Sequence, residues 1–164
     1  MYNYFVKIEY DGTNYVGWQN QKNGKSVQQV IEKAIKKILK SKIKLIGAGR
    51  TDKGVHAYGQ CANFKVKEKI DDKKKFINSI NFFLQNKFIS ILDIKEKDIN
   101  FHSRYSAKER VYEYHIVNRL GSLSIYKNKA WHIKKKLDIK ILKKGAEILQ
   151  GEHDFSTFRA SSCT

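Results

Sequence analysis

A regular alternation of apolar and polar residues marks the start of the chain. Apolar side chains recur there at every second position: Tyr4, Val6, Ile8 and Tyr10. Because successive side chains of a strand point to opposite faces, this alternation predicts a strand with one buried face. The residues 58–66 alternate in the same way, and the shorter apolar runs 43–48 and 88–94 are further strand candidates.

Two segments between these strands have apolar residues at helical spacing. In the segment 26–40 seven of them fall on one stripe: Val27, Val30, Ile31, Ala34, Ile35, Ile38 and Leu39. Ser26 followed by Gln29 has the spacing of a capping box, which predicts that the helix begins there. A second helix is expected to begin at Asp71 or Asp72, and five apolar residues form its buried stripe: Phe76, Ile77, Ile80, Phe83 and Leu84.

These elements predict the order β-α-β-β-α-β for the first hundred residues. Two helices on one face of an antiparallel sheet form the ferredoxin-like α+β arrangement. Many RNA-binding modules have this topology.

After Phe101 the pattern partly repeats. We predict a strand over 109–118, with four side chains on one face: Arg110, Tyr112, Tyr114 and Ile116. A short strand at 130–133 and a helix capped by Asp138 should follow. We therefore expect an N-terminal ferredoxin-like half over 1–100 and the start of an incomplete second half over 101–164.

Charge indicates the class of partner. The chain has 33 lysine and arginine residues against 16 aspartate and glutamate residues, a formal net charge of +17. A chain this basic is typical of proteins that bind nucleic acid, although excess lysine can also serve solubility alone. Because there is no apolar run of membrane-spanning length, no signal-peptide pattern and no disulfide framework, we expect a cytoplasmic protein without a membrane partner.

The glycine-rich stretch GAGRTDKGVHA, residues 47–57, contains the main candidate for chemistry. Asp52 is its only acidic residue, and the glycines around it permit positive φ angles and close approach of another backbone. The carboxylate could be a nucleophile, a general base, a metal ligand or a cap of its own turn. Arg50 could hold a phosphate or pair with Asp52.

Other chemistries find little support in the sequence. The five histidines form no zinc-binding motif, so we expect no metal, although Asp52 with His56 leaves a metal-dependent nuclease as a weaker alternative. No serine has a nucleophile-elbow context, and no phosphate-loop or dinucleotide fingerprint is present, so we expect no cofactor. Aromatic residues on strand faces are core residues by default, but Tyr112 shares its predicted face with Arg110. A ring and a guanidinium group together suit a flat base and its phosphate.

Four segments resemble, in order, the motifs of the tRNA pseudouridine synthase A family. They are YDGTNYVGWQNQ (10–21), GRTDKGVHA (49–57), FHSRYSAKERVYEYHI (101–116) and GEHDFSTF (151–158). The second is similar to the family's signature loop and is the most specific of the four. Together they extend over nearly the whole chain.

The resemblance implies the pseudouridine synthase fold and an isomerase without a cofactor, which converts uridines in the anticodon stem-loop of tRNA to pseudouridine. It implies that Asp52 starts the reaction as nucleophile or base, and that Tyr112 stacks on the target uracil. Arg50 would take the place of the flipped nucleotide or grip its phosphate. It also implies a homodimer, with one tRNA contacting both subunits.

Chains of that family continue beyond the equivalent of Thr164, so we expect this sequence to lack the family's C-terminal part. That part would complete the second half of the sheet and supply a basic residue paired with the aspartate, together with an apolar wall for the uracil. The alternative from another class of protein is a non-catalytic RNA-binding module with the same fold and basic face.

Overall fold

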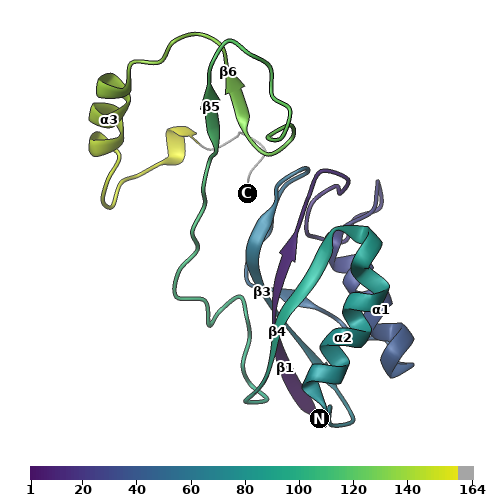
Figure 1. Cartoon of the computed structure of the whole chain (residues 1–164). Helices are drawn as coiled ribbons and strands as arrows, with labels where there is room; N and C mark the ends of the chain where they lie inside the picture. The colour runs from purple at the N-terminus through teal and green to yellow at the C-terminus, as the bar shows by residue number, and fades with distance from the viewer. Residues whose placement is uncertain (159–164) are drawn as a thin grey trace. The chain divides into compact units, whose positions relative to one another are not determined.

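The computed structural model of the chain describes residues 1–158. Two compact units make up the chain, the first containing residues 1–113 and the second beginning at Tyr114 (Figure 1). The sequence placed a boundary after residue 100. That the two units are halves of one repeated fold stays a prediction.

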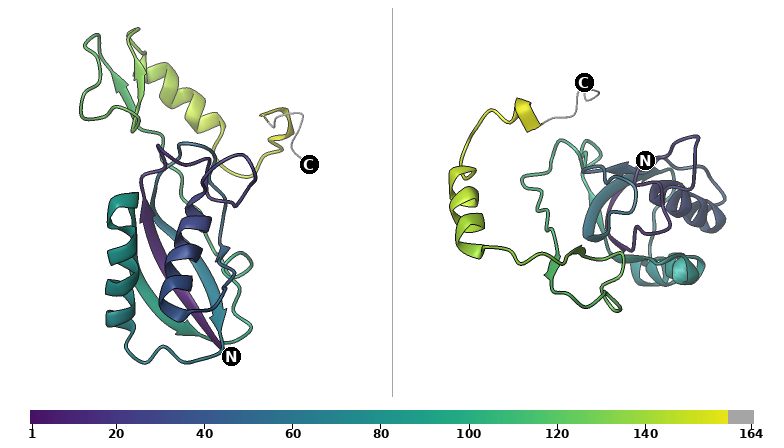
Figure 2. Two further views of the ribbon diagram at one scale, coloured as in Figure 1. Left: turned by 90° about the vertical axis from the view of Figure 1, so that its right-hand side faces the viewer. Right: turned by 90° about the horizontal axis from the view of Figure 1, so that it is seen from above.

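The first unit has the predicted order of elements. Its strands and helices are β1 (Tyr2–Tyr10), α1 (Val27–Leu39), β2 (Ile46–Gly47), β3 (Ala57–Val66), α2 (Lys73–Leu84), a 3₁₀ turn (Gln85–Lys87) and β4 (Ile89–Lys97). The sheet has the strand order β2-β3-β1-β4, and every neighbouring pair is antiparallel. Both helices lie on the same face of this sheet (Figure 2). The predicted α+β class is confirmed.

The core fills the space between that sheet face and the two helices. The alternating residues of β1, from Tyr4 to Tyr10, are all buried on the helix side of the sheet. They pack with Phe64 of β3 and with the apolar stripe of α1, including Ile31 and Ile35. Burying such side chains contributes about 1.5–3 kcal/mol each, so this layer supplies most of the folding free energy of the unit.

Local hydrogen bonds set the helix starts as the sequence predicts. The Ser26 hydroxyl accepts the N–H of Gln29 at 3.1 Å, and the Asp72 carboxylate accepts the N–H of Lys75 at 2.8 Å. Each bond satisfies a backbone donor that the first helical turn leaves open. The first helix therefore begins at Val27 and the second at Lys73.

The second unit contains less regular structure. Its elements are β5 (Ile116–Asn118), β6 (Trp131–Ile133), α3 (Ile139–Ile148) and a 3₁₀ turn (Ser156–Phe158). The two strands pair in parallel, unlike the strands of the first unit. The Asp138 carboxylate accepts the N–H groups of Lys140 and Ile141, which confirms it as the cap of α3. Of the described residues in this unit, none is buried.

Two predicted strands are shorter in the structure. The prediction of a strand over 109–118 is wrong for 109–115, which has no regular structure, because no neighbouring strand within the described residues offers this stretch a hydrogen-bond ladder. The predicted strand 43–48 is reduced to β2 because α1 takes the backbone groups of Leu45. The carboxylate of Glu32 accepts its N–H, and the amide of Gln28 donates to its carbonyl.

No helix within residues 1–158 is both long enough and apolar enough to cross a membrane.

Candidate active site

The loop that carries Asp52 connects β2 to β3 and is fastened at several backbone positions. The carbonyl of Thr51 accepts the N–H of Trp18 at 3.0 Å, and the N–H of Gly54 donates to the carbonyl of Tyr15 at 3.3 Å. Within the loop, the carbonyl of Asp52 accepts the N–H of Val55 at 3.2 Å. These bonds hold the backbone on both sides of the aspartate.

Glycines allow a second loop, residues 11–18, to pack directly against the Asp52 loop. A Cβ atom on Gly12 would lie 2.0 Å from the carbonyl oxygen of Val55, and one on Gly17 would lie 2.5 Å from that of Thr51. Gly17 also has a φ of +114°, which disfavours other residues. The positive φ expected in the signature stretch is found at Gly54, with a φ of +80°.

The Asp52 side chain is exposed and unconstrained by protein contacts. Within the described residues its carboxylate makes no side-chain hydrogen bond and no ion pair, and the same is true of the Arg50 guanidinium group. Asp52 therefore neither caps its own turn with its side chain nor pairs with Arg50, two of the possibilities that the sequence leaves open. The carboxylate is accessible to a ligand.

A buried hydroxyl group supports the residue before Asp52. The hydroxyls of Tyr10 and Thr51 form a hydrogen bond of 2.7 Å, and the Tyr10 ring stacks on Trp18 with the ring centroids 6.0 Å apart. Burial raises the pKa of the Tyr10 hydroxyl. The bond to Thr51 opposes this shift, and the nearby hydroxyl of Tyr112 adds to it. Tyr10 therefore stays protonated at neutral pH.

Arg110 brings the segment after residue 103 to the start of the Asp52 loop. Its Nε and Nη2 atoms donate to the carbonyl of Ala48 at 3.2 and 2.8 Å, and Nη2 also donates to the carbonyl of Arg104 at 3.2 Å. A Cβ atom on Gly49 would lie 3.5 Å from Arg110 Nε and 3.9 Å from the Tyr112 hydroxyl. Tyr112 thus reaches the loop with its side chain 63% exposed.

His56 contacts the neighbouring loop. Its Nδ1 atom lies 3.2 Å from the Asp11 carboxylate and 3.2 Å from the N–H of Gly12. Nδ1 accepts from Gly12 when it carries no proton and donates to Asp11 when it carries one. In residues 1–158, no three or more histidine, cysteine, aspartate or glutamate side chains are grouped as ligands for a metal ion.

A pair of buried amides fixes the segment that leads to Arg110. The Nδ2 atom of Asn3 donates to the carbonyls of Asp98 and Phe101, both at 2.9 Å. Asn63 donates to the Asn3 side-chain oxygen at 2.9 Å and accepts the N–H of Ser103 at 2.9 Å. Both asparagines are 1% exposed. The amide pair therefore attaches residues 98–103 to β1 and β3.

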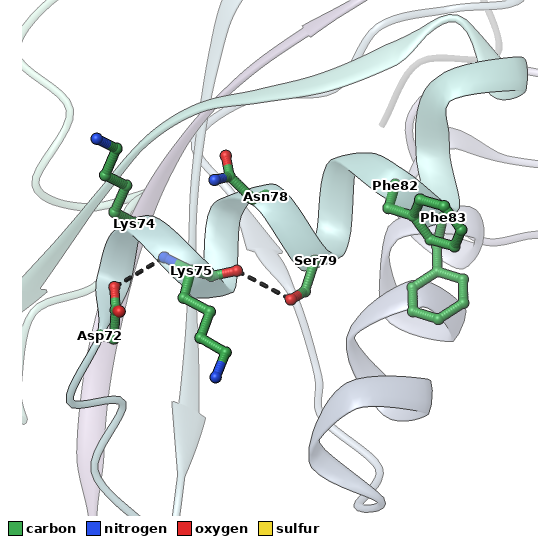
Figure 3. A pocket seen from close by; sticks show the side chains of 7 residues that line it. All are labelled: Asp72, Lys74, Lys75, Asn78, Ser79, Phe82 and Phe83. Atoms are coloured by element: carbon green, nitrogen blue, oxygen red, sulfur yellow. Dashed lines mark hydrogen bonds between the residues drawn. The ribbon is translucent and has the colours of Figure 1, made fainter.

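An open pocket of about 660 Å³ lies along α2 (Figure 3). It is lined by the side chains of a single helix, among them Lys74, Lys75, Phe82 and Phe83. None of its lining residues belongs to the loops described above. We assign the candidate active site to the Asp52 loop, because it carries an accessible carboxylate and a guanidinium group without a partner among residues 1–158, and because the ring of Tyr112 lies against it.

Sequence reasoning placed Asp52, Arg50, Tyr112 and Arg110 in one site, and the structure brings all four to the same loop. It did not identify the hydrogen bond from Tyr10 to Thr51, because the position of Tyr10 in the apolar pattern indicated only a core residue. A buried tyrosine usually finds a partner for its hydroxyl group, and this was the available signal.

Comparisons with known proteins give a consistent result. A family model described as tRNA pseudouridine synthase matches residues 7–106. The chain is 54% identical over 163 residues to the tRNA pseudouridine synthase A of Pelagibacter ubique (strain HTCC1062), covering 99% of this chain and 66% of that protein. It is 47% identical over 161 residues to the protein of the same name from Thermoanaerobacter sp. (strain X514), covering 98% of this chain and 65% of that protein. The chain thus spans 65–66% of the length of these curated relatives.

Proposed function

This chain belongs to the tRNA pseudouridine synthase family, and on that premise we propose that it carries the catalytic aspartate of an isomerase that converts uridine in tRNA to pseudouridine. The observation that carries the proposal is the accessible carboxylate of Asp52, on a loop that backbone hydrogen bonds fasten and that the exposed side chain of Tyr112 reaches at Gly49. The family resemblance inferred from four sequence segments is confirmed.

The reaction needs one well-placed carboxylate and no redox partner. The N1–C1′ bond of uridine breaks, the uracil turns, and its C5 atom bonds to C1′. The proton on C5 is lost while N1 gains one, so the product is an isomer of the substrate. Asp52 either attacks C1′ as a nucleophile or removes a proton from the ribose to form a glycal, and both routes use the same carboxylate.

The target uridine has to leave its stack before the carboxylate can reach its sugar. Flipping a nucleotide costs a few kcal/mol, and stacking on an aromatic side chain returns about 1–3 kcal/mol. The exposed ring of Tyr112 provides such a surface next to the Asp52 loop. We propose that the uracil stacks there, with its ribose toward Asp52.

Arg50 and Arg110 have different roles in this proposal. Arg50 has no protein partner among the described residues, which leaves its guanidinium group for a phosphate or for the space of the flipped nucleotide. Arg110 uses Nε and Nη2 on backbone carbonyls, so only its Nη1 group is available for the substrate contact that the sequence predicts.

The substrate is proposed to be the anticodon stem-loop of tRNA, bound by a homodimer. The net charge of +17 supports an RNA partner, because lysines and arginines that neutralise phosphates release counterions. Binding should therefore weaken as salt is raised. The dimer and the choice of stem-loop rest on the family resemblance alone.

The proposal is tested by Asp52→Asn, with pseudouridine mapped chemically after incubation with total tRNA. Asp71→Asn is the matched control, because it removes the same charge from an exposed position outside the site. We expect Asp52→Asn to abolish product while tRNA binding stays within about twofold of the control, since one charge among many phosphate contacts matters little. Equal product from both variants would sink the catalytic role.

The same assay separates the alternatives. Product that survives EDTA argues against a metal-dependent nuclease, whereas EDTA-sensitive RNA cleavage would favour one. Salt-dependent tRNA binding without product, both in this chain and in a version lengthened to match its relatives, would indicate a non-catalytic RNA-binding module.

A further inference from the structure

We propose that Tyr10 is a positioning residue for Asp52, acting through the hydroxyl group of Thr51. This inference rests on the proposed catalytic role of Asp52. Tyr10 is 2% exposed, so it does not meet a substrate itself. It acts on the residue directly before the aspartate.

The tyrosine ring is held rigidly. It stacks on Trp18 with an interplanar angle of 30°, and both rings belong to the core of the first unit. The fixed ring therefore fixes the position of the hydroxyl oxygen. This oxygen lies 2.7 Å from the Thr51 hydroxyl, across 41 residues of sequence.

The strand pairing is irregular close to Tyr10. Opposite the two residue steps from Ile8 to Tyr10 in β1, the neighbouring strand β3 takes three, from Gln60 to Ala57. Such a β-bulge bends the ladder and changes the direction of side chains near it. A second irregularity lies between Lys7 and Ile8 in the pairing with β4. In both pairings the extra residue lies in the neighbouring strand, so the ladders on both sides of β1 are irregular toward its C-terminal end, where Tyr10 lies.

Thr51 is held at two points, one on its backbone and one on its side chain. Its carbonyl accepts the N–H of Trp18, and its hydroxyl bonds to Tyr10. The carbonyl of Asp52 then accepts the N–H of Val55. Because the Asp52 carboxylate has no protein partner of its own among the described residues, its position depends on this backbone. Removing the Tyr10 hydroxyl leaves Thr51 with a single anchor.

Tyr10→Phe tests this inference because it keeps the ring and removes only the hydroxyl group. Tyr4→Phe is the matched control. Tyr4 lies on the same strand and the same buried face, and its hydroxyl accepts the N–H of Ile70 at 2.8 Å, far along the strand from the Asp52 loop. Both variants lose one buried hydrogen bond, so a general loss of stability is common to them.

We expect Tyr10→Phe to lower kcat for pseudouridine formation about tenfold with KM unchanged, because a misplaced reacting group weakens transition-state stabilisation more than substrate binding. Thr51→Val should have the same effect, and the double variant should lose no more than either single variant. Tyr4→Phe should keep the wild-type kcat. Equal kcat for Tyr10→Phe and wild type, or equal losses in Tyr10→Phe and Tyr4→Phe, would overturn the inference.

Amide hydrogen exchange of Gly54 and Val55 gives a readout that does not depend on activity. If Tyr10 positions the loop, these two amides exchange faster in Tyr10→Phe than in Tyr4→Phe. Faster exchange, with no pseudouridine formed either by this chain or by a version lengthened to match its relatives, would refute the proposed function and leave the structural link intact. Unchanged exchange together with an active wild type would refute the positioning role and leave the function intact.

Discussion

The helices α1 and α3 have similar sequence signals and opposite surroundings. Each is amphipathic, and each begins after a side-chain oxygen that caps its first turn. Nevertheless, α1 buries five residues against the sheet, whereas α3 buries none within its unit. An amphipathic pattern predicts a helix and its apolar face, but burial also requires a surface that can cover that face.

The sheets of the two units explain the difference. In the first unit β1 alone extends over nine residues and pairs with a long strand on each side. In the second unit β5 and β6 pair over three residues each. A two-stranded pair of this length offers too little apolar area to hold a helix, and isolated helices of ten residues are marginal in water. The first unit should therefore carry the cooperative folding transition.

The largest expected effect compares the same truncation in the two helices. Ile35→Ala should lower the free energy of unfolding by about 2–5 kcal/mol, because Ile35 is fully buried in the core. Ile141→Ala should change it by less than about 0.5 kcal/mol, since that side chain is 67% exposed. Urea unfolding followed by circular dichroism measures both. Comparable losses would show that α3 is covered in solution.

The next effect tests whether the segment 98–103 belongs to the first unit. Asn63→Ala should cost about 1–3 kcal/mol, because it leaves the Ser103 N–H and the Asn3 side-chain oxygen without their partner. Asn78→Ala on the exposed side of α2 is the control and should be nearly neutral. If thermal unfolding gives the two variants the same midpoint, the amide pair does not anchor the segment.

The N-cap residues of α1 and α3 allow the two helices to be compared through a smaller change in stability. Ser26→Ala and Asp138→Ala each remove an N-cap, which is worth about 0.5–2 kcal/mol to its helix. In α1 the loss should appear in the unfolding free energy of the whole first unit. In α3 it should appear as lower helix content with no change in the main transition. A shift of the main transition by Asp138→Ala would argue that the two units unfold together.

The smallest expected effect is the dependence of the unfolding free energy on pH that two buried tyrosines of the first unit produce. Burial raises the pKa of Tyr10 and of Tyr15 above the ordinary value of 10.0. The folded state therefore holds these protons more tightly than the unfolded state. Their contribution is fully present below pH 10 and is lost as the pH rises through the raised values. Unfolding free energy measured from pH 8 to 11 should fall above pH 10, and less steeply in Tyr10→Phe.

The sequence predicted most of the first unit because its signals are local. Period-two alternation gave β1 and β3, and helical spacing with Ser26 or Asp72 as the cap gave both helices. Elements that depend on a distant partner were predicted less accurately. The stretch 109–115 has the alternation of a strand but no strand beside it among the described residues.

The sequence indicated candidate residues for the site but not the hydrogen bonds that join them. A single aspartate among glycines indicated a candidate reactive group, and the family motifs indicated Tyr112 as a candidate stacking residue. The bonds that assemble the site join residues 41 and 62 positions apart, from Tyr10 to Thr51 and from Arg110 to Ala48. Contacts between residues so far apart in the chain produce no periodic pattern in the sequence. The support of the loop became visible only in the folded chain.

The packing of Trp18 on Tyr10 and against Gly47 also gives the loop an optical reporter. The chain has two tryptophans, and Trp18 is 3% exposed in the first unit whereas Trp131 is 67% exposed in the second. An indole shielded from water emits at shorter wavelength than a solvated one. The short-wavelength part of the tryptophan emission therefore comes from Trp18, beside the Asp52 loop. Under the proposed function, RNA bound at this loop is expected to change the Trp18 emission without any added label.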